Sequence, residues 1–367
     1  MTPLRSWGIA PWQLEPGPRN TICDVPGVKV GHCTVRLDEP SVARTGVTVV
    51  VPEADLPVER LPAAAVVFNG TGEMTGFHQV NEWGLLETPI ALTGTASLPL
   101  VLQGLSEHMF GRCAALGRSM APCLPVVAEC NDMWLSDART YAVAPVHVHE
   151  AIAAASDHQD LWGSVGAGTG MVSFGFKGGI GSASRLLDIG GERFCLGSVC
   201  LVNFGQPGDL AIAGRPLGHL PGEVVRRPHL PPPPDGSLVV VLATDAPLDH
   251  LQLRRLAARS ALGMARVGSY GRHGSGDLFL AFSTRAQHGD PQDAFPMRRT
   301  MRHELLGDVF RAAVETTEEG ILHALFTACD ETGFLGRKVA ALPLDEVRRR
   351  LTPNGAGPEA RPAGGDG

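Results

Sequence analysis

A run of four prolines ends directly in front of one of the most apolar stretches of the chain. The sequence reads PPPPDGSLVVVLATDAPL over 231–248. Proline fixes φ and lacks a backbone N–H, so these prolines cannot join a central sheet. The residues from Ser237 onward read instead as a strand buried on both faces, followed by a turn at Ala246-Pro247. We therefore expect an exposed connection over 223–236 that delivers Ser237 to the first position of a buried strand.

Short apolar segments alternate with glycine-rich turns in the rest of the chain. Strands are predicted at VKVGHCTV (28–35), GVTVVVP (46–52), AAAVVFNG (63–70), FCLGSVCLVNFG (194–205) and GSGDLFLAFST (274–284). Over 248–267 the apolar residues follow the spacing of an amphipathic helix, and 298–329 is largely helical in pattern. The order of these segments, without internal repeats, predicts an α+β fold with sheets in the middle and helices outside.

Composition places the chain among ordinary globular proteins and excludes several classes of function. A net charge of −7 over 367 residues, with no basic stripe, gives no support for nucleic-acid binding. No apolar run is long enough for a transmembrane helix, and the first residues lack a secretory h-region. Eight scattered cysteines without a CxxC motif suggest reduced thiols in a cytoplasmic protein. The Gly/Pro-rich tail, 353–367, is predicted to be disordered.

The usual motifs of catalysis and cofactor binding are weak in this sequence. No G-x-S-x-G nucleophile elbow occurs. The glycine-rich segment 163–185 lacks the Walker A and GxGxxG patterns, so close backbone packing competes with a phosphate-binding role there. His147 and His149 could place two imidazoles on one strand face, but a third ligand at suitable spacing is not evident. We expect no metal and no cofactor.

The Gly236-Ser237 bond offers a different kind of chemistry. If this bond is cleaved, Ser237 carries both a hydroxyl and a free α-amine. An α-amine has a pKa of about 7.7–8.0, so near neutral pH it serves as a base. A serine in this position then needs no histidine to activate it. Gly236 would permit the strained turn that self-attack requires. The competing interpretation is a plain linker with an incidental Asp-Gly-Ser turn.

Seven segments, in this order, resemble one family. They are TICDVPGVKVGH (21–32), FNGTGEMTG (68–76), ETPIALT (87–93), FGFKGGIGSASR (174–185), VNFG (202–205), GSLVVVLATDAPL (236–248) and SGDLFLAFST (275–284). Together they strongly resemble the DmpA family of L-aminopeptidase/D-esterases and β-peptidyl aminopeptidases. The resemblance extends from residue 20 to about residue 350.

This resemblance implies a fold and a maturation step. The fold would be a four-layer αββα sandwich, similar to the N-terminal-nucleophile hydrolases but with different strand connectivity. Residues 1–352 would form one domain. Self-cleavage at Gly236-Ser237 would give a large chain, 1–236, and a small chain, 237–367, with Ser237 as the nucleophile in both processing and turnover. The relatives suggest a homo-oligomer of cleaved heterodimers.

The resemblance also implies roles for further residues. Ser275 and Asp277 in SGDLF match the family's second serine and its acidic neighbour, which would orient the amine and hydroxyl of Ser237. Asn203 in VNFG matches an oxyanion-hole asparagine. Glu129 in VVAECND matches the acid that binds the substrate's free ammonium group.

Two segments depart from the family pattern and point to an altered specificity pocket. The family often has a DGYL-type segment whose aromatic side chain lines the pocket, whereas this chain has NDMWL, with Met133 and Trp134. We expect Trp134 to contact substrate. The segment ALTGTASLP (91–99) lacks the family's usual asparagine.

The expected activity is release of N-terminal residues from small peptides, amides or esters through an acyl-enzyme on Ser237. Besides a family member that cleaves itself but has lost activity through the changes at Met133 and Trp134, two alternatives stay open. In the first, the same acyl-enzyme passes its acyl group to an amine, which makes the protein an acyltransferase. In the second, the chain stays intact and the glycines of 163–185 bind a phosphate or another small ligand without catalysis.

Overall fold

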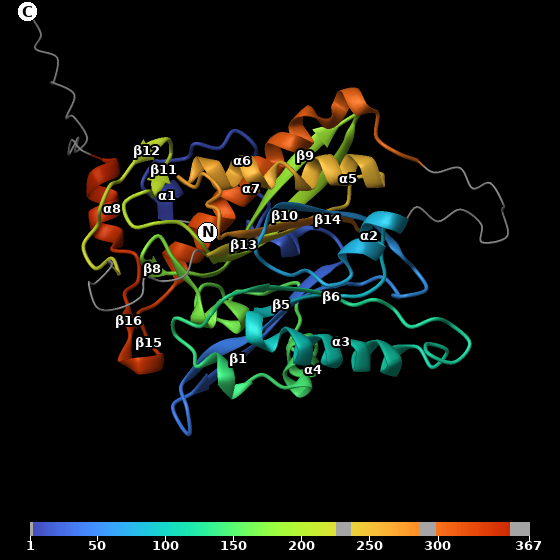
Figure 1. The fold of residues 1–367 in the computed structure, drawn as a ribbon. Helices are drawn as coiled ribbons and strands as arrows, with labels where there is room; N and C mark the ends of the chain where they lie inside the picture. Colours follow the sequence, from blue (N-terminus) through green and yellow to red (C-terminus); the bar gives the residue numbers. More distant parts are fainter. Residues whose placement is uncertain (1–2, 225–235, 286–298, 353–367) are drawn as a thin grey trace, which may run out of the picture.

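Two β-sheets lie face to face in the computed structural model, which describes residues 3–224, 236–285 and 299–352 (Figure 1). In the four-stranded sheet the order is β1 (Val28–Leu37), β2 (Ala43–Pro52), β5 (Ile90–Gly94) and β6 (Val126–Cys130). In the six-stranded sheet the order is β4 (Leu85–Leu86), β3 (Leu61–Gly70), β14 (Gly276–Ser283), β13 (Ser237–Thr244), β10 (Glu192–Asn203) and β9 (Gly179–Ile189).

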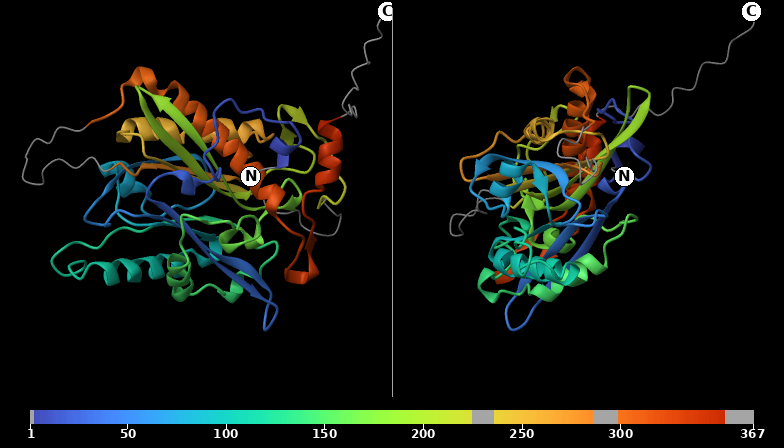
Figure 2. Two further views of the ribbon diagram at one scale, coloured as in Figure 1. Left: turned by 180° about the vertical axis from the view of Figure 1, so that it is seen from behind. Right: turned by 90° about the vertical axis from the view of Figure 1, so that its right-hand side faces the viewer.

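Helices cover the outer face of each sheet. The four-stranded sheet packs against α3 (Leu98–Arg112) and α4 (Pro145–Ala153). The six-stranded sheet packs against α5 (His250–Ala257), α6 (Ser260–Arg266) and α7 (Leu306–Thr327). Figures 1 and 2 show these layers edge-on from three sides. The predicted αββα sandwich is therefore confirmed.

Shorter elements lie around the edges of these layers. They are α1 (Pro3–Ser6), α2 (Phe77–Trp83), α8 (Leu344–Leu351) and the two-residue strands β7 (Val172–Ser173), β8 (Phe176–Lys177), β11 (Ala211–Ile212), β12 (Arg215–Pro216), β15 (Glu331–Thr332) and β16 (Lys338–Val339). No helix in the described ranges combines the length and the apolar composition needed to span a bilayer.

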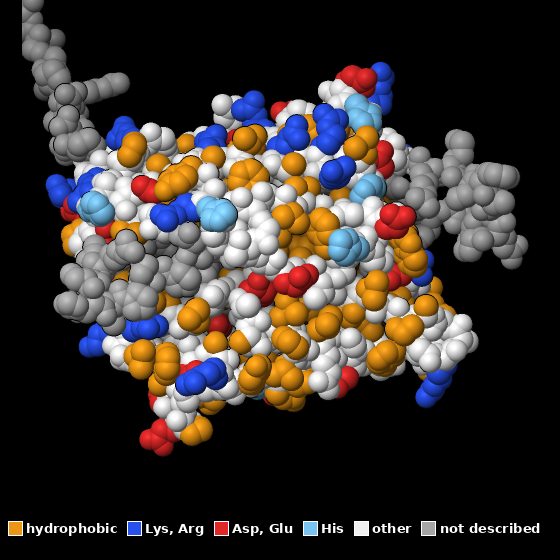
Figure 3. Space-filling model, in the orientation of Figure 1, with side chains coloured by type: hydrophobic (Ala, Val, Ile, Leu, Met, Phe, Trp, Pro, Cys, Tyr) orange, Lys and Arg blue, Asp and Glu red, His pale blue; other side chains and the backbone are white. Residues whose placement is uncertain are grey.

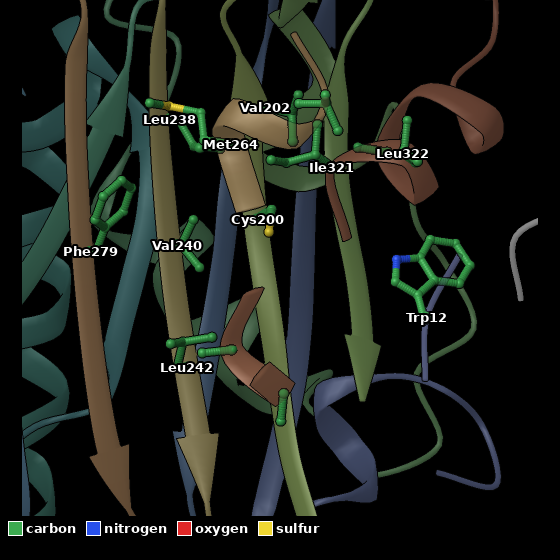
Figure 4. Packing of buried hydrophobic residues seen from close by; sticks show 14 of the residues in the cluster. Trp12, Cys200, Val202, Leu238, Val240, Leu242, Met264, Phe279, Ile321 and Leu322 are labelled. Atoms are coloured by element: carbon green, nitrogen blue, oxygen red, sulfur yellow. The ribbon is translucent and has the colours of Figure 1, made fainter. Parts of the chain in front are cut away.

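Strand β13 is buried on both faces, as its unbroken apolar sequence predicts. Val239 and Val241 lie in the core between the two sheets. Leu238, Val240 and Leu242 lie in the core beneath the helices, where Figure 4 shows Met264 of α6 and Ile321 of α7 nearby. Side chains alternate along a strand, so Ser237 shares the face of Val239 and Val241. This alternation directs Ser237 into the space between the sheets.

Two local predictions were wrong. The residues at 248–267 form two helices, α5 and α6, because an apolar stripe cannot distinguish one helix from two consecutive helices on the same core. His147 and His149 lie in α4 and not on a strand, so residues two apart point to different sides of the helix. Among the described residues no group of three potential metal ligands occurs.

The glycines of 163–185 are used for close backbone packing. A Cβ on Gly181 would lie 1.9 Å from the Gly320 carbonyl oxygen, and one on Gly178 would lie 2.2 Å from the Val202 carbonyl oxygen. Neighbouring backbone occupies the positions where side chains would stand, which does not favour the phosphate-binding alternative. The predicted connection over 223–236 lies outside the described residues, apart from residues 223, 224 and 236.

The core between the sheets predicts a measurable difference between two leucines. Leu280 of β14 is fully buried there, so Leu280→Ala should lower the free energy of unfolding by about 2–5 kcal/mol. Leu262 of α6 is 57% exposed, and Leu262→Ala should change it by at most about 0.5 kcal/mol. Denaturant titration of both variants measures the difference, and equal losses would contradict this core assignment.

Candidate active site

Ser237 begins β13 and has a defined neighbour on each side. Across the antiparallel pair with β10 its partner is Asn203, and across the parallel pair with β14 its partner is Gly276. A Cβ on Gly236 would lie 1.5 Å from the Asn203 carbonyl oxygen. Only glycine therefore fits before Ser237 in this backbone arrangement.

The amide of Asn203 is held in one orientation. Its Oδ1 accepts the Val172 N–H at 2.8 Å, and its Nδ2 donates to the Asn131 carbonyl oxygen at 3.0 Å. An amide nitrogen has two hydrogens, and within the described residues only one N–H of Asn203 is engaged. A fixed donor beside a serine hydroxyl is the arrangement that stabilises an oxyanion.

A second polar group lies on the β14 side of Ser237. Ser275 Oγ donates to Asp277 Oδ1 at 2.8 Å, and Asn69 Nδ2 donates to Asp277 Oδ2 at 2.8 Å. Burial raises the pKa of Asp277, while these donors and the Leu238 N–H act in the opposite direction. In register Asp277 pairs with Leu238. The carboxylate thus reaches β13 through the amide that follows Ser237.

Asn69 was missed by sequence reasoning as a site residue, although it lies in the FNGTGEMTG segment. The signal was present, because Asn69 is a polar residue at the end of the apolar run AAAVVF. Its contact with Asp277 became visible only when the pairing of β3 with β14 placed the two residues opposite each other.

Glu129 approaches the same region from the other sheet. It lies on β6, is 4% exposed, and its Oε1 accepts the Glu73 N–H at 3.0 Å. Gly72 lies between the Glu129 carboxylate and Gly276. A Cβ on Gly72 would lie 3.4 Å from Glu129 Oε1 and 3.3 Å from Gly276 Cα. The two sheets therefore bring Glu129 towards Gly276, the residue that pairs with Ser237 across β13 and β14.

The Glu129 carboxylate lacks a basic partner within the described part of the chain. Burial raises its pKa, and hydrogen bonds from Thr95 and Glu73 oppose this. Thr95 Oγ1 donates to Glu129 Oε2. Thr95 was not predicted, although it lies in the unusual 91–99 segment. A buried carboxylate without a cation is costly, so this position suits a cationic ligand.

Trp134 lies beside this site and packs against Arg337. The Arg337 guanidinium stacks over its ring at 4.2 Å and donates to the Trp134 carbonyl oxygen at 3.1 Å. The ring packs in a small cluster that includes Val172, which also holds Asn203. A direct contact of Trp134 with substrate remains a prediction. Met133 is 47% exposed.

A small cavity of about 10 Å³, roughly the space of one water molecule, adjoins Gly236 and Ser275. Polar and aromatic side chains line it, among them Phe204, Gln206, Asp209, Tyr270 and Arg272. On the face seen in Figure 3, acidic and apolar side chains adjoin near the middle of the molecule, at the level where the sheets meet in Figure 1.

Comparisons with known proteins agree with this arrangement. Residues 20–339 match the model of Peptidase family S58. Beta-peptidyl aminopeptidase BapA of Sphingosinicella xenopeptidilytica is 37% identical over 364 residues, covering 94% of this chain and 90% of that protein.

Solved structures give the same result. The L-aminopeptidase D-Ala-esterase/amidase of Ochrobactrum anthropi, described as a prototype of the serine aminopeptidases with a variant Ntn hydrolase fold, matches with a TM-score of 0.87 at 34% identity, covering 95% of this chain and 98% of that one. A Burkholderia sp. beta-aminopeptidase matches with a TM-score of 0.83 at 40% identity, covering 94% and 98%.

The fold is a variant of the Ntn hydrolase fold, as in the Ochrobactrum anthropi enzyme. The chain belongs to peptidase family S58 and is a serine aminopeptidase. The predicted family and enzyme class are thereby confirmed, and the roles of individual site residues remain predictions.

The contact between Asn69 and Asp277 predicts a pH effect. Asn69→Ala removes a donor that favours the ionised carboxylate, so the pKa of Asp277 should rise further. If ionised Asp277 supports turnover, the acid limb of the kcat/KM–pH profile moves to higher pH. The value of kcat/KM near neutral pH then falls by up to about 10-fold.

Asn81→Ala is the matched control for this experiment. Asn81 lies in α2, and its Oδ1 accepts the N–H of Ala65 at 3.0 Å. Ala65 is on β3, the strand that also carries Asn69, but this contact does not involve Asp277. Asn81→Ala should leave the acid limb of the kcat/KM–pH profile unchanged. An unchanged limb in Asn69→Ala would show that Asp277 does not need this donor.

Proposed function

We propose that this protein cleaves its own Gly236-Ser237 bond and then acts as an aminopeptidase through Ser237. The observation that carries the proposal is the position of Ser237, which begins β13 directly across from Asn203. Cleavage would leave a large chain, 1–236, and a small chain, 237–367, within one αββα domain. The six-stranded sheet takes strands from both, since β3, β9 and β10 precede the bond while β13 and β14 follow it.

Self-cleavage would proceed through an ester. Ser237 Oγ attacks the Gly236 carbonyl carbon, its proton passes to the departing nitrogen, and the C–N bond breaks. Water then hydrolyses the ester, which releases the Gly236 carboxylate and leaves Ser237 with a free α-amine and a free hydroxyl. The N–H of Asn203 is the donor for the oxyanion in this step, a contribution worth roughly 3 kcal/mol in related sites.

Turnover would use the amine released by cleavage. The α-amine accepts the proton of Ser237 Oγ as the oxygen attacks the substrate carbonyl, and this proton then passes to the leaving amine or alcohol. Water hydrolyses the resulting acyl-enzyme. Ser275 and Asp277 would orient the amine, because their pair contacts the Leu238 N–H next to it.

Glu129 would bind the free ammonium group of the substrate, which makes the enzyme selective for an unblocked N-terminus. The proposed substrates are therefore small peptides, amides and esters with a free amino group. Relatives are named as β-peptidyl aminopeptidases and as an L-aminopeptidase D-Ala-esterase/amidase, so both β-aminoacyl and α-aminoacyl compounds belong in the first substrate panel. We also propose a cytoplasmic homo-oligomer of cleaved heterodimers, with Trp134 contributing to specificity.

The role of Glu129 is tested with an aminoacyl amide and its N-acetylated analogue. The wild type should hydrolyse only the free amine. Glu129→Gln should lower kcat/KM about 10–100-fold, mainly through KM, because a charge-assisted contact is lost. Burial raises the pKa of Glu129, so wild-type kcat/KM should fall on acidification at a higher pH than for an exposed glutamate. The variant should lack this limb.

Glu73→Gln is the matched control, because Glu73 is exposed and contacts Glu129 through its backbone N–H, which the substitution keeps. Its KM should stay within about 3-fold of the wild type, the range of a small surface effect. Hydrolysis of the acetylated analogue at a comparable rate would remove the basis for an aminopeptidase site at Glu129.

A further inference from the structure

Lys177 is a buried cation that the reaction described above does not use. It lies in β8, and its side chain is fully buried. Its Nζ donates to the Gly168 carbonyl oxygen at 2.8 Å and to the Gly178 carbonyl oxygen at 2.9 Å. Within the described residues it forms no ion pair, and burial lowers its pKa to about 7. An ammonium group held this way is expensive to bury, which calls for a specific role.

The two carbonyls lie at the ends of one segment, 168–178, here called the 168–178 loop. Within it Val172 and Lys177 are paired across the short β7/β8 ladder, and the Gly178 N–H donates to the Met171 carbonyl oxygen at 2.8 Å. The Nζ of Lys177 thus ties the start of the loop to its end. A compact loop forms without help from an acidic side chain.

This loop is also what holds Asn203. The Val172 N–H donates to Asn203 Oδ1 at 2.8 Å, and Ser173 Oγ donates to the carbonyl oxygen of Phe204, the next residue, at 2.7 Å. Both contacts come from β7, which pairs with the strand that carries Lys177. The position of the Asn203 amide therefore depends on a segment whose two ends Lys177 joins.

We infer that Lys177 is a positioning residue for oxyanion stabilisation, acting through the 168–178 loop and Asn203. This inference rests on the proposed function of Asn203. The ammonium fixes the loop, the Val172 N–H fixes Oδ1, and the amide N–H2 is thereby turned towards the carbonyl that reacts at Ser237. Lys177 itself touches neither the substrate nor the reacting atoms.

A double-mutant cycle tests this inference. Lys177→Met, Asn203→Ala and the double variant are compared by kcat and KM, with rates expressed per cleaved chain. Lys177→Met should lower kcat about 10–100-fold and leave KM within 2-fold, because an oxyanion donor acts in the transition state. In the Asn203→Ala background the same change should cost no more than 2-fold, since the residue through which it acts is already lost.

Arg185→Met is the matched control, because Arg185 is also a fully buried long cation but pairs with Glu315 and Glu319 of α7. Its effect on kcat should be the same with and without Asn203. Lys177→Gln, which retains two N–H donors, should recover part of the lost kcat, and it replaces Lys177→Met in the cycle if that variant does not fold.

Two results would overturn the inference. One is a loss from Lys177→Met that is fully additive with Asn203→Ala, and the other is a loss expressed in KM alone. A failure of the proposed function looks different, because the wild type would then be inactive or Asn203→Ala would retain full kcat.

Discussion

The register of β13 is the constraint on which the rest of the site depends. The strand is fixed between β10 and β14, and apolar side chains cover both of its faces. A slip by one residue would turn Ser237 towards the helices and place Leu238 between the sheets. It would also separate Ser237 from Asn203, its cross-strand partner. The burial that fixes the register of the strand therefore also fixes the position of the proposed nucleophile.

The electrostatics of the site follow from its place between two sheets. Glu129 and Asp277 are both buried, and burial raises the pKa of each. Asp132, close to Glu129, is buried as well, and its pKa is raised to about 6. In the proposed mechanism the compensating positive charge arrives later, with the α-amine of Ser237 and with the substrate ammonium. In that mechanism the empty site is unfavourable, and a bound amine compensates its negative charge.

Much of this could be predicted from the sequence, and the remainder could not for physical reasons. The doubly buried β13 was predicted from its apolar run, and the αββα layers from the family resemblance. The two histidines of α4 were misassigned because local polarity does not separate a strand end from a helix start. Asn69 and Thr95 make contacts with distant segments, which no local pattern records, and the contact of Lys177 with Gly168 depends on the folded shape of the 168–178 loop.

The central claim, that Ser237 becomes a terminal nucleophile, is tested most directly by intact mass and N-terminal sequencing of freshly purified protein beside Ser237→Ala. The account predicts that the wild type separates into chains of about 25 and 14 kDa, scaled by length from 38.7 kDa, the smaller beginning Ser-Leu-Val-Val, while the variant stays whole. A wild-type chain that remains intact after long incubation, or one that is cut elsewhere, would contradict it.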